Sequence, residues 1–309
     1  MQPPAIPLLT LSAVAAYEAQ PAGVLLLEPA ATTLPAPCFQ LFRSTYYTIG
    51  LCLQGQAELQ VNLDTYQVQA GSLLVLPAHC LKQWRTRSAD FVSRDVLFTA
   101  DFLPPAPGGH FGQFAFFNRP AVPVLSLPPA LSKRLQVALE QLHQSYQEPH
   151  PYRPELLQTR LQVLLYETAA AYAALTSAAE PGQPRAQLLT RQFKHLLCAH
   201  CTVERQLAFY ASHLCITPKH LTETIRAVTG RGAASLIAEA VTLEARLRLQ
   251  DPALTVAQVA DQLHFADQST FARYFRHTVG QTPTAYRQQL SSGGKPFSDF
   301  LPTTAAHTP

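Results

Sequence analysis

The sequence predicts an α+β protein, with a small antiparallel β-barrel followed by helices in its N-terminal part and an all-α domain in its C-terminal part. Short runs that alternate apolar and polar residues dominate the first hundred residues, whereas apolar residues recur at helical spacing from about residue 130 onward. A third observation is an internal repeat in the last third of the chain. It predicts two helix-turn-helix motifs joined by a linker helix.

The predicted barrel spans about residues 17–102. Its clearest strand signals are residues 46–53, 57–63, 66–69 and 72–76. They are rich in aromatic and β-branched side chains or alternate with a period of two, and turn residues separate them. Strands at this spacing favour a small antiparallel barrel or sandwich. Residues 104–129, rich in Pro, Gly and Phe, predict a loop with one or two short strands.

Two helices are expected between about residues 130 and 178, because apolar residues recur every three or four positions in 131–146 and 157–172. Pro154 suits the first turn of the second helix. Prolines and a glycine then break the pattern. The predicted units are residues 1–178 for the barrel and its helices, 179–186 for a linker, 187–290 for the C-terminal domain and 291–309 for a loose tail.

The composition excludes several classes of protein. Of the 309 residues, 47% are hydrophobic and 14% are charged, so the chain can bury substantial cores. No apolar run approaches the roughly 18 residues that a membrane span needs, and the N-terminal residues lack the pattern of a signal peptide. Six cysteines without close regular spacing do not indicate a disulfide framework. We therefore expect a cytoplasmic protein without membrane association.

The net charge of +3 is unevenly distributed along the chain. Residues 185–290 hold 12 Lys and Arg against 7 Asp and Glu, whereas residues 1–184 hold 10 against 12. The C-terminal domain thus has a net charge of +5 and the preceding part −2. A polyanion is expected to bind the basic C-terminal domain.

In the internal repeat, residues 210–216 match residues 259–265 at an offset of 49, and residues 221–230 match residues 271–280 at an offset of 50. Each copy has the pattern of a short helix, a tight turn and a longer helix that ends at a glycine. The sequence also predicts the caps. These are Thr217 followed by Pro218, Asp267 in the second copy, and the stop signals Gly230 and Gly280.

The longer helix of each copy has one apolar and one polar face. The predicted apolar faces are Leu221, Ile225 and Val228 in the first copy, and Phe271, Phe275 and Val279 in the second. The predicted polar faces are Lys219, Thr222, Glu223 and Arg226, and Gln268, Ser269, Arg273 and Arg276. Residues 236–249 predict a rigid spacer helix between the copies. Such a spacer suits successive major grooves, roughly 34 Å apart on one side of DNA.

These residues resemble the DNA-binding domain of AraC/XylS-family transcription regulators. The similarity covers about 100 residues and is most specific in residues 259–265, 269–276 and 280–287. One departure is His264, which stands where the family usually has glycine in the turn. The resemblance implies a sequence-specific regulator that binds double-stranded DNA and contacts RNA polymerase.

The resemblance also implies roles for the two polar faces. It implies that Lys219, Thr222, Glu223, Gln268, Ser269 and Arg273 face base edges. Arg226 and Arg276 fit contacts to phosphates better, because a flexible cation positions the protein without reading sequence. Arg273 is the preferred reader of guanine, whose O6 and N7 match a guanidinium. Glu223 could accept a hydrogen bond from cytosine or pair with a nearby Arg.

The first 170 residues resemble, less specifically, the cupin-like sensing domain of the same family, on residues 49–55 and 70–77. The resemblance implies a small-molecule effector, and a homodimer formed through the helices after the barrel. Tyr46, Trp84, Arg43 and Arg85 are candidate effector-binding residues, because aromatic rings could line a pocket and arginines could neutralise an anion. Alternatively, the aromatic rings fill the barrel core, and the two helices pack only on their own barrel.

Two further hypotheses concern metals and catalysis. Cys198 and Cys201, beside His195, have a CxxC spacing without a second pair, which favours packing over zinc. A metal-dependent cupin-type enzyme fused to a helical interaction domain is the alternative function. That chemistry needs several His and a carboxylate, whereas His79 and His110 have no suitable neighbours in the sequence. We therefore predict no catalytic residues, no metal and no cofactor.

Overall fold

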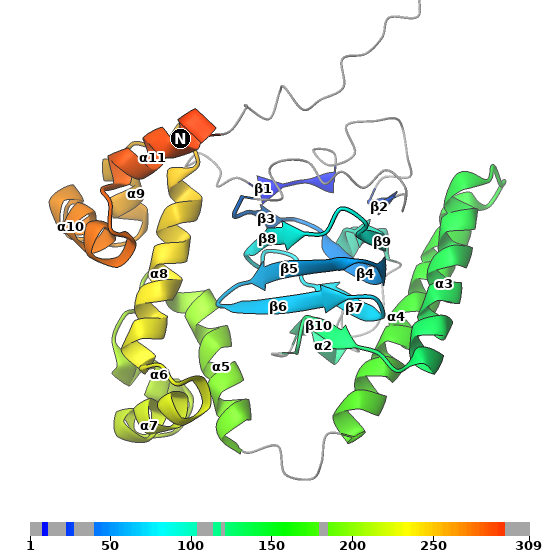
Figure 1. The fold of residues 1–309 in the computed structure, drawn as a ribbon, viewed down its shortest axis with the longest axis horizontal. Helices are drawn as coiled ribbons and strands as arrows, with labels where there is room; N and C mark the ends of the chain where they lie inside the picture. The colour runs from blue at the N-terminus through cyan, green and yellow to red at the C-terminus, as the bar shows by residue number, and fades with distance from the viewer. Residues whose placement is uncertain are drawn as a thin grey trace, which may run out of the picture.

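The computed structural model describes residues 8–11, 23–27, 40–103, 114–118, 121–178 and 185–293. An N-terminal part of sheets and helices lies beside a helical C-terminal part (Figure 1). This confirms the predicted fold class. The start of the predicted barrel, most of the predicted linker and most of the predicted tail lie outside the described residues.

The strands form two antiparallel sheets rather than one closed barrel within the described part of the chain. The strands are β1 (Leu8–Leu9), β2 (Val24–Leu27), β3 (Arg43–Ser44), β4 (Tyr47–Gln54), β5 (Gln56–Val61), β6 (Asp64–Gln69), β7 (Ser72–Leu76), β8 (Lys82–Arg87), β9 (Val92–Phe98) and β10 (Val124–Ser126). One sheet has the order β10-β7-β4-β9-β2 and the other β6-β5-β8, while β1 and β3 form a short parallel pair.

Strand β7 is buried on both faces, one toward the helices that follow the sheets and the other toward the three-stranded sheet. All five of its residues are buried. Leu73 and Val75 belong to a core shared with the helices that follow the sheets, whereas Leu74 and Leu76 belong to a core shared with the three-stranded sheet. Because successive side chains of a strand point to opposite faces, the continuous apolar run reflects burial on both faces.

The helices after the sheets are α3 (Pro129–Gln147) and α4 (Arg153–Ala178), which confirms the two predicted helices. Leu139 of α3 and Leu161 of α4 are buried against the five-stranded sheet. Residues 104–129 were predicted to form a loop with one or two short strands. Their described part contains strand β10, as expected, and also a short helix, α2 (Ala115–Asn118). A short 3₁₀ helix, η2 (Ala100–Phe102), follows β9.

The C-terminal part consists of seven helices among the described residues. They are α5 (Arg185–His200), α6 (Leu207–His213), α7 (Pro218–Thr229), α8 (Ala233–Leu249), α9 (Val256–Gln262), α10 (Gln268–Val279) and α11 (Pro283–Gly293). We call α6 with α7 motif one and α9 with α10 motif two. They lie toward opposite ends of the spacer helix α8 (Figure 1). Most of α8 is buried, because it contributes to the cores of both motifs and also contacts the N-terminal part.

The predicted helix ends are confirmed. The Thr217 hydroxyl accepts a hydrogen bond from the backbone N–H of His220 at 3.2 Å, and the Asp267 carboxylate accepts one from Thr270 at 2.7 Å. Gly230 and Gly280 end their helices in the left-handed conformation, with φ of 69° and 82°. One detail of the predicted apolar faces is wrong. Val228 is 39% exposed and lies in the last turn of α7, whose buried residues are Leu221, Thr224 and Ile225.

No helix among the described residues combines the length and the apolar character that crossing a membrane requires.

Candidate DNA interface and effector cavity

The second helices of the two motifs present their polar faces to solvent. In α7, Leu221 and Ile225 are buried, while the predicted polar residues are exposed or, for Thr222, half-buried. In α10, Phe271 and Phe275 are buried, and all four predicted polar residues are exposed. The structure thus brings the eight predicted DNA-binding residues onto two exposed helix faces held by one rigid helix.

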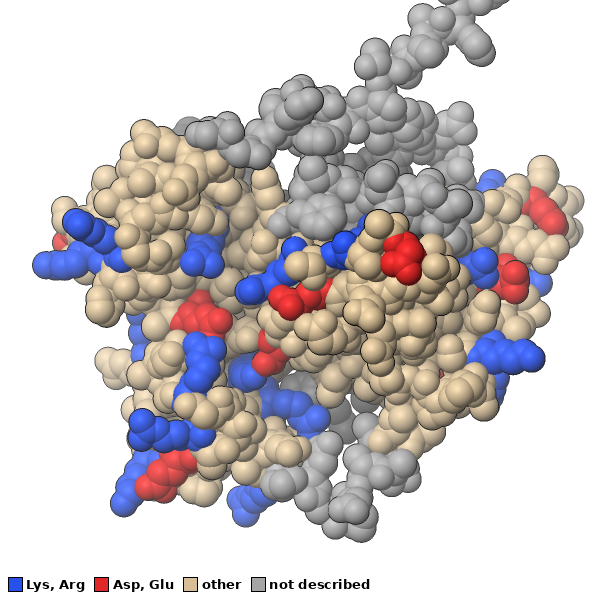
Figure 2. Space-filling model, in the orientation of Figure 1, with Lys and Arg blue, Asp and Glu red and all other residues tan. Residues whose placement is uncertain are grey.

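Basic side chains extend from this region of the surface. Figure 2 shows Lys and Arg projecting at α10 and at α7, on the left of the view. A shallow hollow on α10 is lined by Arg273, Arg276, His277, Ala272 and Thr282. Two arginines beside a hollow on an exposed helix can bind phosphate or base-edge acceptors, because a guanidinium offers a fork of N–H donors.

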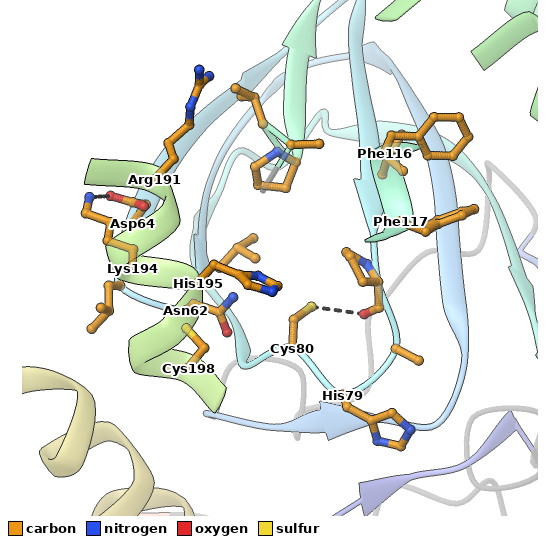
Figure 3. A pocket seen from close by; sticks show the side chains of 18 of the residues that line it. Asn62, Asp64, His79, Cys80, Phe116, Phe117, Arg191, Lys194, His195 and Cys198 are labelled. Atoms are coloured by element: carbon orange, nitrogen blue, oxygen red, sulfur yellow. Dashed lines mark hydrogen bonds and ion pairs between the residues drawn. The ribbon is translucent and has the colours of Figure 1, made fainter. Parts of the chain in front are cut away.

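A cavity of about 350 Å³ lies between the sheets and helix α5. Side chains from both parts of the chain form its walls. Figure 3 shows His195 of α5 on one side of the cavity and Phe117 of α2 on the other. The apolar lining includes Val61, Leu63, Val75, Phe116, Phe117, Val122 and Pro123. Because α5 forms one wall, this cavity exists only while the N-terminal sheets and the C-terminal helices are in contact.

The charged side chains that line the cavity are mostly basic. They are Arg43, Arg191 and Lys194, with Asp64 as the acidic residue, besides His79 and His195. Asp64 forms an ion pair with Lys194, so its charge is already balanced. Arg43 in turn pairs with Glu244 of α8. By count, besides the two histidines, the lining side chains comprise three cations and one carboxylate next to apolar walls. This combination suits an anionic group attached to an apolar body.

Two cysteines, Cys80 from the sheets and Cys198 from α5, also line the cavity. Burial raises the pKa of the Cys198 thiol to about 12, so it stays protonated at neutral pH. Cys201 is buried in the core of motif one, as the packing hypothesis for the CxxC spacing expects. The described residues contain no group of three or more His, Cys, Asp or Glu side chains arranged to hold a metal ion.

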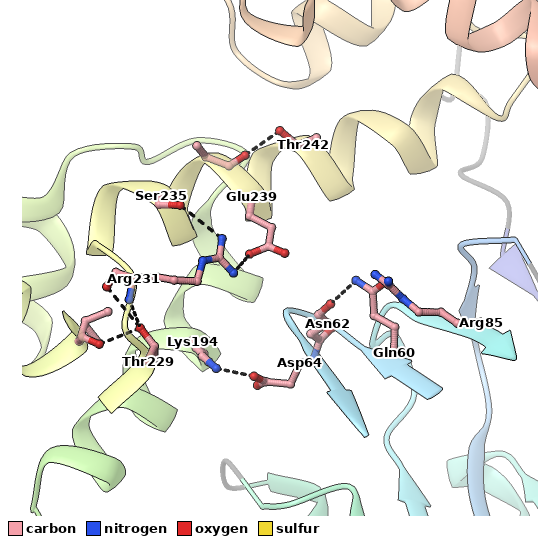
Figure 4. A network of polar contacts seen from close by, with 12 residues as sticks. Gln60, Asn62, Asp64, Arg85, Lys194, Thr229, Arg231, Ser235, Glu239 and Thr242 are labelled. Carbon is pink, nitrogen blue, oxygen red and sulfur yellow. Dashed lines mark hydrogen bonds and ion pairs between the residues drawn. The ribbon is translucent and has the colours of Figure 1, made fainter. Parts of the chain in front are cut away.

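The turn between β5 and β6 contacts the C-terminal part. Leu63 in this turn packs against the core of motif one and against a second cluster formed by Leu41, Leu81, Leu243 and Leu247. The next residue, Asp64, reaches Lys194 of α5 (Figure 4). The turn residue Asn62 is fixed to the segment before β8, since its side-chain oxygen accepts a hydrogen bond of 3.0 Å from the backbone N–H of Leu81.

Of the four candidate effector residues, Arg43 lines the cavity and the other three do not. Arg85 is exposed and donates a hydrogen bond of 2.8 Å to Gln60, which in turn donates one of 2.9 Å to the backbone of Asn62 at the cavity wall (Figure 4). Trp84 packs edge-to-face on Phe91 between the two sheets. Tyr46 is buried, with the Lys82 ammonium 5.3 Å from its ring centre.

Four kinds of lining residue were not predicted from the sequence, namely Asp64, Arg191, Lys194 and the aromatic residues of α2. Asp64 and Lys194 are 130 residues apart, so no local pattern connects them. The one available signal was the spacing of Arg191, Lys194, His195 and Cys198, which places them within two turns of a helix. That spacing does not reveal which segment of the sheets they face.

Comparisons with known proteins match both parts of the chain. A family model described as a helix-turn-helix domain matches residues 210–289, and one described as an AraC-like ligand binding domain matches residues 39–165. The regulatory protein PocR of Salmonella typhimurium is 30% identical over 100 residues, which are 32% of this chain and 33% of PocR. The match thus spans about a third of that relative's length.

Two solved structures are also similar. One is unsaturated fatty acid bound wild-type ToxT from Vibrio cholerae, with 15% identity and a TM-score of 0.40 over 90% of this chain and 100% of that one. The other is a DNA-binding transcriptional dual regulator from Escherichia coli K-12, with 22% identity and a TM-score of 0.31 over 34% of this chain and 93% of that one.

Proposed function

This chain belongs to the AraC family, and from that premise we propose that it is a sequence-specific, DNA-binding transcription regulator controlled by a small molecule. The observation that carries the proposal is the pair of exposed polar faces on α7 and α10, which the buried helix α8 holds rigidly. Two recognition helices on one rigid spacer can enter successive major grooves.

Within this function, each polar face has two tasks. Lys219, Thr222 and Glu223 of α7, and Gln268, Ser269 and Arg273 of α10, contact base edges. Arg226 and Arg276 each lie about one turn beyond the last of these residues in their helices. They bind phosphates and position the protein without reading sequence. The folded unit that does this corresponds to residues 187–290.

The cavity between the sheets and α5 is the proposed effector site. Its apolar walls and its excess of arginine and lysine favour a small amphipathic anion, such as a monocarboxylate. A ligand that contacts both walls binds the docked arrangement of the two parts better than a separated one. It therefore shifts the population toward the docked arrangement and changes how the recognition helices are presented to DNA. Arg43 belongs to this site, whereas Tyr46, Trp84 and Arg85 would contribute to it by supporting the sheets.

We further propose a homodimer formed through α3 and α4. Val137, Val163 and Tyr166 are large apolar side chains on these helices and are 45%, 48% and 57% exposed. Burying them against a second copy would remove this apolar surface from water. The protein would act in the cytoplasm, contact RNA polymerase at its promoters and catalyse no reaction.

The first test is selection of bound sequences from a random duplex DNA library at a stated salt concentration. Enrichment of a motif that spans about two successive major grooves is the expected result. Salt-sensitive binding without any enriched motif would refute sequence-specific regulation. Small carboxylates are then screened by thermal shift on the wild type and on Lys194→Gln, in which the loss of a positive charge from the cavity wall should weaken binding of an anion. A carboxylate that binds without changing the affinity for the selected DNA would refute the control mechanism.

A further inference from the structure

The two helix-turn-helix motifs meet at Phe265. One hydrophobic core gathers α5, α6, α7 and the first half of α8, and another gathers the second half of α8 with α9 and α10. Phe265, in the turn between α9 and α10, packs against both cores. The relative placement of the motifs therefore depends on the contacts that hold this turn.

Arg205, which immediately precedes motif one, reaches across to that turn. Its guanidinium carbon lies 3.8 Å from the centre of the Phe265 ring, in a cation–π contact. The same guanidinium donates a hydrogen bond to the carbonyl oxygen of Leu263, the residue that caps the C-terminal end of α9. A cation at this position also interacts favourably with the helix dipole. The single side chain that precedes motif one thus contacts both a ring and a backbone carbonyl of motif two.

The position of Arg205 is itself well defined. The neighbouring residue, Glu204, accepts a hydrogen bond of 2.7 Å through its backbone carbonyl from the hydroxyl of Tyr210, which is fully buried in motif one. Burial lowers the pKa of Arg205. Because the ordinary pKa of an arginine is far above 7, the side chain nevertheless remains a cation. We call Arg205, with its contacts to Phe265 and Leu263, the brace. The backbone next to this charged side chain is anchored by a hydrogen bond from Tyr210, a buried residue of motif one.

Tyr274 of α10 ties the same turn to the spacer helix. Its hydroxyl donates a hydrogen bond of 3.0 Å to the carbonyl oxygen of Ala238 in α8, and its ring lies 5.2 Å from that of Phe265. The turn of motif two is thus held from two directions. Arg205 holds it to motif one, and Tyr274 holds it to α8.

We propose that Arg205 is a positioning residue that sets the spacing and the angle between α7 and α10, and hence the separation of the two DNA segments that the protein reads. This inference rests on the DNA-binding function proposed above. The brace has no counterpart in the other copy of the repeat. The residue at the matching offset is Leu254, which is buried in the core of motif two. Without Arg205, motif two keeps its attachment to α8 and the apolar packing of Phe265 on the core of motif one, but it loses the hydrogen bond and the cation–π contact that fix the turn.

The test varies the spacing of the selected DNA site. Duplexes carry the two recognised segments at the selected separation, or with one base pair added or removed between them. Each base pair changes the separation by about 3.4 Å and the relative rotation by about 34°. For the wild type we expect affinity to fall at least about tenfold on either change, since a rigid pair of motifs cannot follow the rotation.

In Arg205→Ala, we expect the difference between spacings to shrink to about threefold or less, and the affinity for the selected spacing to fall. Arg205→Lys should rescue part of the preference, because an ammonium can bond the Leu263 carbonyl but cannot stack as a plane on Phe265. The matched control is Arg231→Ala, which removes an arginine whose partners are Thr229 of α7 and Ser235 and Glu239 of α8. Its preference between spacings should equal that of the wild type.

A role in stability alone would lower the affinity for all three duplexes by the same factor. An Arg205→Ala protein that keeps the wild-type preference therefore overturns the proposal. If that variant does not fold, Phe265→Leu removes the ring and keeps an apolar side chain, and the same loss of preference is expected. A wild type that selects no DNA sequence overturns the DNA-binding function itself, which is a separate result from an unchanged spacing preference.

Discussion

Arg43 of the N-terminal sheets pairs with Glu244 of the spacer helix α8, 201 residues further along the chain. Glu244 is 3% exposed and also binds Arg248, one helical turn beyond it. The carboxylate is thus enclosed by two guanidinium groups, one from each part of the protein. Because Arg43 also lines the cavity, one side chain touches both the proposed effector site and the helix that holds the two motifs.

Replacing Glu244 by Gln should loosen the contact between the sheets and α8. Gln keeps the size of the side chain but leaves two buried cations facing each other without a carboxylate. Breaking a buried ion pair in this way costs about 3 kcal/mol or more. We expect faster amide hydrogen exchange in β3 and in residues 81–82, which pack near α8. Arg231→Gln, which breaks a more exposed pair within the C-terminal part, should leave these amides unchanged. Equal exchange in both variants would contradict the prediction.

Arg273→Ala should reduce discrimination at one base pair of the DNA site. The exposed guanidinium on α10 can bind guanine through two parallel hydrogen bonds, which are worth about 1–3 kcal/mol of discrimination. The measurement compares affinities for the selected site and for its single-base variants. Arg273→Lys is the matched control, because it keeps the charge but cannot form the bidentate pair. It should lose discrimination and keep most of the nonspecific affinity. Unchanged discrimination in both variants would rule out base reading by Arg273.

Arg226→Ala should weaken binding to all DNA sequences by similar factors. A side chain that binds a phosphate contributes through release of counterions, so its loss should reduce the salt slope of log K by about 0.9. Titrations of the selected site and of an unrelated duplex at several salt concentrations measure this slope. Arg226→Lys should keep it. A change in sequence preference without a change in slope would assign Arg226 to base edges instead.

The local features of the C-terminal part could be predicted because their causes lie within a few residues. Thr217 and Asp267 cap helices whose first turns follow them directly, and Gly230 and Gly280 supply the left-handed conformation that ends a helix. The spacer helix was predicted for a similar reason, since its apolar residues follow one another in sequence. The structure extends it to Ala233–Leu249.

Features that depend on contacts between distant segments could not be predicted in the same way. The arrangement of the strands as two sheets follows from which strands pair, and the alternation within each strand does not specify its partner. Helix α2 has four residues, too few to show a helical period. The cavity brings together α2, α5 and the turn at Leu63, so its lining emerges only from the fold. Arg43 was predicted as an effector residue for its charge, without any indication of Glu244.

His264→Gly should stabilise the protein. His264 has a φ of 53° in the turn of motif two, and Cys215, at the equivalent position of motif one, has a φ of 55°. This left-handed conformation costs a residue with a Cβ atom about 1–2 kcal/mol. Glycine avoids that cost but loses about 0.5–1 kcal/mol through the greater freedom of the unfolded chain. Urea unfolding should therefore show a net gain of about 0.5–1 kcal/mol. His264→Ala keeps the Cβ atom and should show no gain. An equal gain in both variants would assign the effect to the imidazole.

Asp95 should make the stability of the N-terminal part depend on pH. It lies opposite Gly50 in the pairing of β9 with β4, and a Cβ atom at residue 50 would lie 1.8 Å from its carboxyl oxygen. Ser93 donates a hydrogen bond of 2.5 Å to the other oxygen. Burial in this narrow space raises the pKa of Asp95 from 3.8 to about 6, an effect that the hydrogen bond from Ser93 opposes only in part.

The raised pKa determines the sign of the effect. Between about pH 4 and pH 6 the folded protein holds a proton on Asp95 that the unfolded chain has already lost. The contribution to stability is therefore complete below pH 4 and is lost as the pH rises through 6, by about 3 kcal/mol in total. Asp95→Asn imitates the protonated form. Its unfolding free energy relative to the wild type should rise from pH 4 to pH 7.5, as urea unfolding at both values measures. A constant difference between the two proteins would show that Asp95 ionises normally in the folded state.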